Sequence, residues 1–454
     1  MEIKNSKSRE LWLSKAGFIL AAAGSAIGLG NLWRFPYVTG MYGGGAFVLV
    51  YLLSIIAIGI PIMVAEFIIG RRTQRNPVGA FGKLGKTKGW QLVGWLGLAT
   101  GFILLSYYSV VGGWILDYVL KSAGGLFHGK SPAEINQMFD MVLKSPLRQV
   151  FFHALFLFLV TYIVSRGIHK GIELWNKILM PLLFGILLLL MVNSLFSPGV
   201  REGMRFLFYP DFSKITATAI LEAMGQAFFP LSIGLGTMIT YGSYLKRDVS
   251  LMNSATEICV LDTLVALVAG IVIFPIVFTY GLAPSAGPGL FFKTLPVVFF
   301  VLPGGRIIAF LFFLVVAFAA LTSAISLLEL VVAYFIDERK WGRKKAAIIM
   351  GLTIFIFGVP SALSFNTLRD ITLIKGINIF NFLDLLVTNY MLPAGGLLIA
   401  IFCGWFLSRK ESLDEIRKGG NDLFFYRVWR FIIRYIAPVA VLLVFSWKAG
   451  VIAL

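Results

Sequence analysis

The sequence has few charged residues for its length. Of its 454 residues, 14% are charged while 58% are hydrophobic. A soluble domain covers its surface with a larger share of charged side chains. The composition therefore excludes a soluble protein for most of the chain and predicts that the lipid bilayer is its solvent.

The sequence also has few residues suited to redox, metal or nucleotide chemistry. Its two cysteines, Cys259 and Cys403, fall within predicted helices, and its three histidines have no metal-ligand spacing. It has no P-loop motif and no long soluble segment that could house a nucleotide-binding domain. We therefore expect neither a disulfide framework nor ATP-driven pumping. Since no nucleophile, base and oxyanion set is recognisable either, we expect no enzyme.

What the sequence does have is a series of long apolar stretches. A helix that spans a bilayer needs about 20 mostly apolar residues. Eleven stretches qualify, near residues 16–39, 46–70, 91–120, 150–166, 174–196, 216–243, 258–283, 306–336, 344–363, 379–407 and 430–452. The sequence thus predicts an all-α polytopic membrane protein with 11 transmembrane helices. The first stretch is long enough to be a retained helix rather than a cleaved signal.

The basic residues predict how the chain is oriented. The formal net charge is +18, but Lys and Arg lie between the apolar stretches rather than on one folded face, so we expect no nucleic-acid partner. Most of them fall on one side when the N-terminus is cytoplasmic and the C-terminus is outside. The densest runs, 339–345 and 409–434, would then meet anionic headgroups on the inside. We expect the inner (plasma) membrane and no obligate protein partner.

Two of the apolar stretches are interrupted in their middle. The first contains Gly24, Gly28, Gly30 and Asn31, and the sixth contains Pro230 followed by two further glycines. Such residues free backbone groups that must find partners inside the protein. Interruptions at corresponding places in two halves indicate inverted repeats with a binding site at the midplane.

The interruptions therefore predict a domain organisation. We expect a 5+5 inverted repeat with broken helices 1 and 6, in which residues 1–200 form helices 1–5 and residues 201–410 form helices 6–10. Residues 411–454 would form a cytoplasmic linker and helix 11. The alternative is that the glycines only allow close helix packing. That reading would not require Asn31, nor the ionisable residues Glu66, Asp262 and Glu329 within apolar stretches.

Oxygen-bearing residues in these stretches suggest a cation and an acid as ligands. Thr322 and Ser323 place two hydroxyls in the eighth stretch, and Asp262 places a carboxylate in the seventh. A small hard cation takes oxygen ligands, and a bound cation would keep Asp262 ionised. The hydroxyls could instead bond back to their own helix. The free N–H groups of a broken helix suit a carboxylate, which suggests an amino acid or a related acid.

The sequence resembles the neurotransmitter:sodium symporter family. The motifs that carry the resemblance are Gly24-Ser-Ala-Ile-Gly-Leu-Gly-Asn31-Leu-Trp-Arg34-Phe-Pro36, Gly43-Gly-Gly-Ala-Phe47, Tyr107-Tyr108, Ser232-x-Gly234-x-Gly236 and Leu321-Thr-Ser323. The resemblance covers essentially the entire chain. Eleven helices make it similar to the bacterial subgroup that imports hydrophobic and aromatic amino acids by alternating access.

The resemblance implies two sodium sites. The ligands of one would be the carbonyls of Gly24, Ile27 and Ala319 and the hydroxyls of Thr322 and Ser323. The ligands of the other would be the carbonyls of Ala26 and Pro230, the side chains of Asn31 and Asp262, and the carboxylate of the substrate. Since Ala266 stands where chloride-dependent members have serine, and Asp262 supplies a fixed charge, transport is expected to be independent of chloride.

The resemblance also implies an amino-acid site. The substrate carboxylate would meet Leu29, Gly30 and Tyr108, and its ammonium would meet Ala26 and Phe229, with Ser232 nearby. The residues that would set side-chain selectivity are Leu104, Phe229, Leu235, Ser323 and Leu327. Their largely apolar character favours a hydrophobic or aromatic L-amino acid. Small neutral amino acids or related carboxylates, a channel, and a non-transporting receptor with the same fold stay open as alternatives.

Two ion pairs would act as gates. The resemblance implies that Arg34 and Asp384 close the outside, beneath which Tyr108 and Phe229 would form a lid. The residues that would close the inside are Arg9 and Asp337, supported by Trp12, Ser243 and Tyr244. The alternative for Arg34 and Asp384 is an ordinary interfacial pair. The sequence gives no role for Met41 and Tyr42, which replace the usual Glu-Asn of the family.

Overall fold

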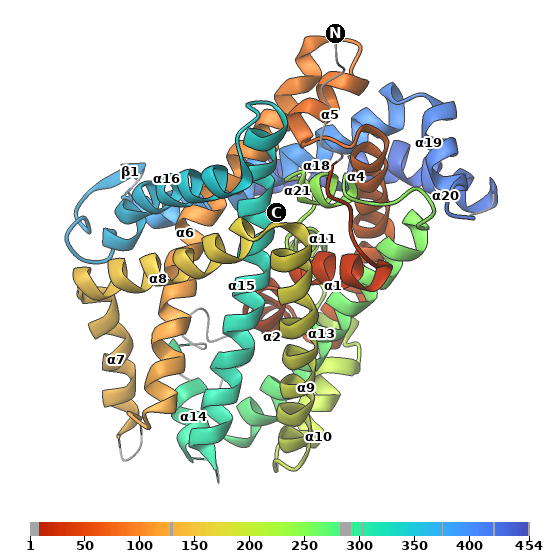
Figure 1. Cartoon of the computed structure of the whole chain (residues 1–454). Helices are drawn as coiled ribbons and strands as arrows, with labels where there is room; N and C mark the ends of the chain where they lie inside the picture. Colours follow the sequence, from red (N-terminus) through yellow and green to blue (C-terminus); the bar gives the residue numbers. More distant parts are fainter. Residues whose placement is uncertain are drawn as a thin grey trace.

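The structure is a computed structural model that describes residues 9–127, 130–281, 292–293, 295–301, 304–374, 376–420 and 423–452. Helices make up most of it, and Figure 1 shows the long helix α15 (Gly305–Asp337) in the middle of the molecule. Strands β1 (Thr372–Ile374) and β2 (Ile377–Asn378) form a small antiparallel pair. The prediction of an all-α membrane fold is confirmed.

Nine helices among the described residues are long and apolar enough to cross a bilayer. They are Gly45–Thr73 (α3, Gly45–Ser54; η2, Ile55–Gly59; α4, Ile60–Thr73), Lys88–Ala123 (η3, Lys88–Trp90; α6, Gln91–Ala123), Pro146–Ser165 (α8), Ile168–Leu195 (η4, Ile168–Glu173; α9, Leu174–Leu195), Leu251–Thr279 (α13), Gly305–Asp337 (α15), Arg343–Leu363 (α16), Ile379–Phe406 (α17, Ile379–Leu385; η7, Leu386–Met391; α18, Leu392–Ile401; η8, Phe402–Phe406) and Leu423–Lys448 (α20, Leu423–Phe431; η9, Ile432–Ile436; α21, Ala437–Lys448). Shorter helices connect them: α5 (Pro77–Leu84), α7 (Pro132–Lys144), α10 (Val200–Phe208), η5 (Phe212–Lys214), α14 (Leu295–Val301) and α19 (Arg409–Arg417).

The first predicted stretch is a bent pair of helices. Helix α1 (Lys15–Ala26) ends where Ile27 adopts an extended conformation, and the chain becomes helical again in η1 (Gly30–Arg34) and α2 (Phe35–Met41). The two halves are bent by 53°, and counting them as one span raises the number to ten. The predicted interruption between residues 24 and 31 is thus present.

The sixth predicted stretch is divided more widely. Helix α11 (Ala217–Phe228) and helix α12 (Thr237–Gly242) are separated by residues 229–236, in which Ser232, Gly234 and Gly236 have positive φ. Each half is too short to count as a span by itself, so the total of eleven stays a prediction. The predicted seventh stretch ends with residues 282–283, which lie outside the described residues, as do residues 1–8 and 453–454.

A buried glutamate satisfies the backbone of this second interruption. Glu66 on α4 accepts hydrogen bonds from Gly234 N–H through Oε1 at 2.6 Å and from Ile239 N–H through Oε2 at 3.2 Å. These donors have lost their helical partners and would otherwise be unpaired in a protein interior. Glu66 therefore belongs to the fold of helix six.

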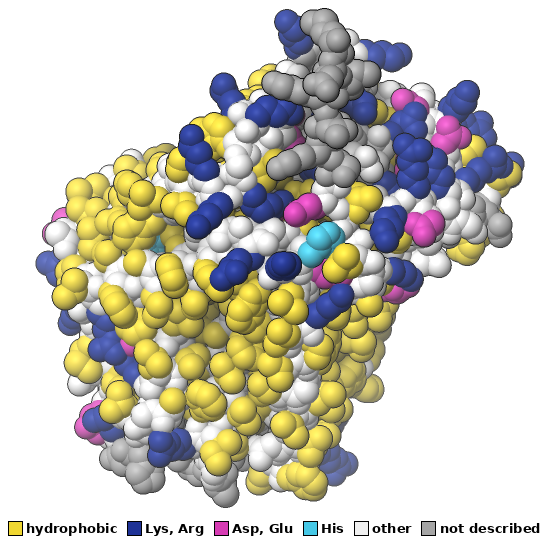
Figure 2. All heavy atoms as spheres, in the orientation of Figure 1, with side chains coloured by type: hydrophobic (Ala, Val, Ile, Leu, Met, Phe, Trp, Pro, Cys, Tyr) yellow, Lys and Arg dark blue, Asp and Glu magenta, His cyan; other side chains and the backbone are white. Residues whose placement is uncertain are grey.

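The surface agrees with a bilayer environment. Figure 2 shows hydrophobic side chains over most of the visible lower face, while Lys and Arg side chains gather towards the upper end. Large hydrophobic side chains such as Phe196 and Leu147 are more than four-fifths exposed. Because lipid rather than water would cover such side chains, their exposure carries no cost in a membrane.

Candidate functional site

The two interruptions meet in the interior of the molecule. Ser232 Oγ donates to the carbonyl oxygen of Ser25 at 2.8 Å, and Gln226 Nε2 donates to the carbonyl oxygen of Gly30 at 2.9 Å. Beside them is a small cavity of about 50 Å³, here named the central cavity. Its lining is Ser25, Ala26, Gly28, Leu29, Gly30, Leu104, Tyr108, Phe229, Pro230, Ser232, Leu235, Ser323, Leu327 and Leu392. This set includes every residue predicted to contact the substrate.

The wall of the central cavity contains polar groups among mainly apolar side chains. Tyr108 Oη is buried and has no hydrogen-bond partner among the described residues. Gly28 has no side chain to fill the space, and a Cβ added there would lie 2.7 Å from Ser323 Oγ and 3.2 Å from Tyr108 Oη. A buried polar atom without a partner is uncommon in a folded protein and calls for a ligand or an ordered water. The rest of the lining is mainly apolar.

The residues predicted for the first ion site belong to α15 and to the end of α1. Ser323 Oγ donates to the carbonyl oxygens of Gly24 and Ile27, at 3.3 and 3.2 Å. Thr322 Oγ1 lies 3.1 Å from the carbonyl oxygen of Ala319. Thr322 therefore bonds back to its own helix, as the alternative interpretation expects, whereas Ser323 reaches across to the interrupted helix. The hydroxyl of Ser323 thus lies beside two of the predicted carbonyl oxygens, and that of Thr322 beside the third.

The second predicted ion site has an unpaired carboxylate oxygen. Asn31 Nδ2 donates to Asp262 Oδ1 at 2.8 Å and to the backbone carbonyl of Asp262 at 3.0 Å, while Asn31 Oδ1 accepts the N–H of Gly28 at 3.1 Å. Asp262 Oδ2 is buried and has no hydrogen-bond partner among the described residues. Ala26 and Pro230 line the adjacent central cavity. A cation would compensate the negative charge that burial otherwise penalises.

The predicted inner gate is formed. Arg9 Nη1 lies 2.6 Å from both carboxylate oxygens of Asp337, and Arg9 Nη2 donates to Ser243 Oγ at 2.8 Å. The guanidinium carbon is 4.6 Å from the centroid of the Tyr244 ring. Trp12 adds two bonds to the same region, from its backbone N–H to the carbonyl of Tyr244 and from Nε1 to the carbonyl of residue 241, both at 3.0 Å. These contacts hold the segment before α1 against the end of α15 and against the end of α12 and the residues that follow it.

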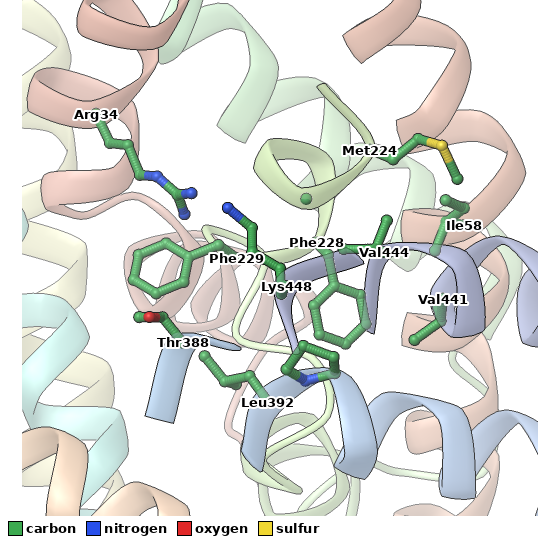
Figure 3. A pocket seen from close by; sticks show the side chains of 12 residues that line it. Arg34, Ile58, Met224, Phe228, Phe229, Thr388, Leu392, Val441, Val444 and Lys448 are labelled. Carbon is green, nitrogen blue, oxygen red and sulfur yellow. The ribbon is translucent and has the colours of Figure 1, made fainter. Parts of the chain in front are cut away.

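The predicted outer gate has a different partner. Arg34 Nη2 lies 3.3 Å from Glu222 Oε2 on α11, and among the described residues it forms no ion pair with Asp384 in this conformation, so the pair with Asp384 stays a prediction. Lys448 Nζ binds the other oxygen of Glu222 at 2.5 Å. Figure 3 shows Arg34, Lys448 and the Phe229 ring around one small pocket, and the guanidinium carbon is 5.0 Å from the ring centroid. Both Glu222 and Asp384 lie near Arg34, and the carboxylate of Glu222 is the nearer of the two to its guanidinium.

A larger cavity leads away from the central cavity on the Arg34 side. It measures about 630 Å³, and both Arg34 and Asp384 line it. The two cavities share the lining residues Leu29, Gly30, Leu104, Tyr108 and Phe229. The larger cavity therefore adjoins the central cavity on the Arg34 side, whereas Arg9 and Asp337 line neither cavity.

Comparisons with known proteins decide the family. The profile of the Sodium:neurotransmitter symporter family matches residues 9–131 and 145–452. The chain belongs to this family. It is 43% identical to the uncharacterised sodium-dependent transporter YhdH of Bacillus subtilis, over 97% of this chain and 98% of that one, and 35% identical to an uncharacterised sodium-dependent transporter of Haemophilus influenzae, over 97% and 98%. The crystal structure of MhsT in complex with L-phenylalanine matches with a TM-score of 0.89 and 47% identity, over 97% of this chain and 100% of that one.

Membership of the sodium:neurotransmitter symporter family settles the general activity. The chain is a sodium-dependent symporter and a multi-pass membrane protein, not an enzyme. The resemblance found in the sequence is confirmed.

Sequence reasoning missed several residues of this symporter. Gln226 ties the two interrupted helices together, and Glu222 with Lys448 forms the charge cluster around Arg34. Each is a polar residue in or beside an apolar stretch, and that position in the sequence could have marked it as a candidate functional residue. Another buried carboxylate, Glu329, accepts hydrogen bonds from Tyr244 Oη at 2.6 Å and from Arg343 Nη1 at 2.7 Å. It therefore belongs to the network around the inner gate.

Proposed function

We propose that the chain imports a hydrophobic or aromatic L-amino acid together with sodium. The observation that carries the proposal is the central cavity, where the unpartnered hydroxyl of Tyr108 lies beside two interrupted helices and an apolar wall. The N–H groups of Leu29 and Gly30 together with that hydroxyl would hold the carboxylate. Leu104, Phe229, Leu235 and Leu327 would contact the side chain. The bound L-phenylalanine of MhsT supports the same class of substrate.

Two sodium ions would bind at the oxygen sets described above. The first set surrounds Ser323 and Thr322, and the second surrounds Asn31 and Asp262. In the second set the substrate carboxylate would complete the shell of the ion. Substrate and ion would then raise the affinity of each other by the same factor. The inward sodium gradient would thereby drive uptake.

The same residues support transport without chloride. Asp262 places a fixed negative charge beside the second ion set, and Ala266 one turn later has no hydroxyl to offer an anion. If this reasoning holds, replacing chloride by gluconate in sodium medium leaves uptake unchanged. Abolished uptake in gluconate would contradict it.

Alternating access would follow from exchange at the two gates. In this conformation the inner pair Arg9–Asp337 is closed, and Arg34 is bound to Glu222 beside the wide outer cavity. We propose that Arg34 leaves Glu222 for Asp384 when the outer path closes. Residues 1–200 and 201–410 would be the inverted repeats, followed by residues 411–454 as linker and last helix. The proposed location is the plasma membrane, with the N-terminus inside and the C-terminus outside.

The test is uptake by the purified chain in proteoliposomes. A panel of amino acids competes with radiolabelled L-phenylalanine under an inward sodium gradient. Phenylalanine, tyrosine, tryptophan and leucine should compete, whereas glycine and aspartate should not. Better competition by glycine would favour small neutral substrates. Binding without accumulation would indicate a receptor, and steady current without uptake would indicate a channel.

A further inference from the structure

A groove runs between two helices that take no part in the central cavity. It lies between α8 and α16, which Figure 1 shows close together, and measures about 930 Å³. Its lining is Ala154, Leu157, Phe158, Thr161, Tyr162, Ser165, Arg166, Lys344, Ile348, Gly351, Leu352 and Phe355. The close approach of Gly351 to Thr161 forms its floor, since a Cβ at position 351 would collide with the Thr161 side chain.

The wall of the groove is apolar and faces the bilayer. Phe158 is 64% exposed, Leu352 is 58% exposed and Ile348 is 48% exposed. All three lie within helices long and apolar enough to span the membrane. Lipid rather than water therefore covers them, and the apolar wall suits a hydrocarbon chain.

One end of the groove is positively charged. Arg166 and Lys344 are exposed, and neither has a carboxylate within 4 Å among the described residues. Arg166 is fixed in place by Tyr162, because its Nη2 donates to Tyr162 Oη at 2.7 Å and its guanidinium carbon lies 4.8 Å from the ring centroid. The nearby Arg343 differs, since it is bound to Glu329 at 2.7 Å.

The acidic groups at this end are already engaged. Glu10 accepts the N–H of Ile168 at 3.0 Å and lies 4.0 Å from Arg343, while Glu329 is fully buried against Arg343. The positive charge of Arg166 and Lys344 is therefore not cancelled locally. This end of the groove lies beside Glu10, the residue that follows Arg9 in the chain. The proposed orientation places it at the cytoplasmic surface.

We propose that the groove binds an anionic phospholipid. The headgroup phosphate lies between the Arg166 guanidinium and the Lys344 ammonium, which provide charge-assisted hydrogen bonds. One acyl chain follows the wall formed by Phe158, Ile348 and Leu352. A zwitterionic lipid offers the same chain without net negative charge, so the two cations discriminate between the headgroups.

Native mass spectrometry of the purified chain tests the proposal. Retention of phosphatidylglycerol is measured in competition with phosphatidylcholine, for the wild type and for Arg166→Gln/Lys344→Gln. The double variant should bind phosphatidylglycerol about 30-fold more weakly, from roughly fivefold for each cation near an anionic surface. The control Lys86→Gln/Lys88→Gln removes two exposed lysines, one between α5 and η3 and one at the start of η3, and should keep the wild-type preference.

A second variant addresses the apolar part of the groove. Leu352→Trp fills the groove at an exposed position, leaves both cations in place and should also reduce phosphatidylglycerol retention. Equal retention by the wild type and the double variant, equal losses in the lysine control, or equal affinity for the two lipids would overturn the proposal. Lipid binding is read without sodium or substrate, so its outcome is separate from that of the uptake assay.

Discussion

Replacement of Glu222 by glutamine tests the outer gate most directly. In the structure Glu222 binds both Arg34 and Lys448, through side chains that are between 13% and 27% exposed. Exposed ion pairs contribute at most about 1 kcal/mol, and removal of one partner of a fully buried pair costs about 3 to 5 kcal/mol. For this partly buried pair we expect a value between these limits, about 1 to 2 kcal/mol, which is roughly a 5- to 30-fold change in equilibrium. Glu222→Gln should therefore release Arg34 to Asp384 and favour the closed outer path.

The assay is the rate at which a cysteine in the cavity reacts with a thiol reagent added from outside. Both native cysteines are buried, so their reaction should contribute little. Leu104→Cys lines both the central cavity and the larger outer cavity and serves as the reporter. In the presence of sodium and the absence of substrate, Glu222→Gln should slow its labelling roughly 5- to 30-fold. Asp384→Asn should accelerate labelling.

Two controls make the result specific. Glu202→Gln removes an exposed carboxylate on α10 and should leave the labelling rate unchanged. The double variant Glu222→Gln/Asp384→Asn should return towards the parent rate, because Arg34 then has neither carboxylate. Unchanged or faster labelling in Glu222→Gln alone would refute the partner exchange.

Three further substitutions probe the central cavity and the inner gate. Gly28→Ala places a Cβ 2.7 Å from Ser323 Oγ and should raise the KM for sodium-dependent uptake by about tenfold or more, whereas Gly342→Ala has open space around it and should leave uptake kinetics unchanged. Asp262→Ala should weaken sodium affinity at least about tenfold, measured as the sodium dependence of uptake; a normal affinity would rule out its role at the ion. Asp337→Asn breaks the inner ion pair and should increase labelling from the inside by about 5- to 30-fold at a cysteine introduced beneath that pair, a change that an ordinary surface pair would not produce.

The positions of the helices could be predicted because a bilayer imposes a length and a polarity on each span. The predicted stretch 379–407 corresponds to Ile379–Phe406, and the stretch 306–336 corresponds to Gly305–Asp337. The interruption in the first stretch was also visible in the sequence, because glycines and Asn31 are costly in a membrane helix unless their backbone is satisfied. Helix α1 does end at Ala26.

Choices between similar side chains could not be predicted. Two carboxylates lie near Arg34, those of Glu222 and Asp384, and in this structure Arg34 binds Glu222. Sequence also cannot distinguish a carboxylate that holds backbone from one that holds a ligand. Glu66 and Asp262 are both acids in apolar stretches, yet Glu66 accepts hydrogen bonds from backbone N–H groups while one oxygen of Asp262 is unpaired among the described residues.

The hydrogen bonds of Glu66 also constrain how helix six can move. They tie the N–H groups of Gly234 and Ile239 to α4, so α12 should travel with α4 as one rigid body. Among the described residues, the segment before α1 is attached to the end of α12 and the residues that follow it through the Arg9 and Trp12 side chains and one backbone bond. We therefore expect the inner path to open by outward swing of α1 alone, with α12 as the fixed frame against which it moves. The irregular segment 229–236 would then take up the difference in motion between α11 and α12.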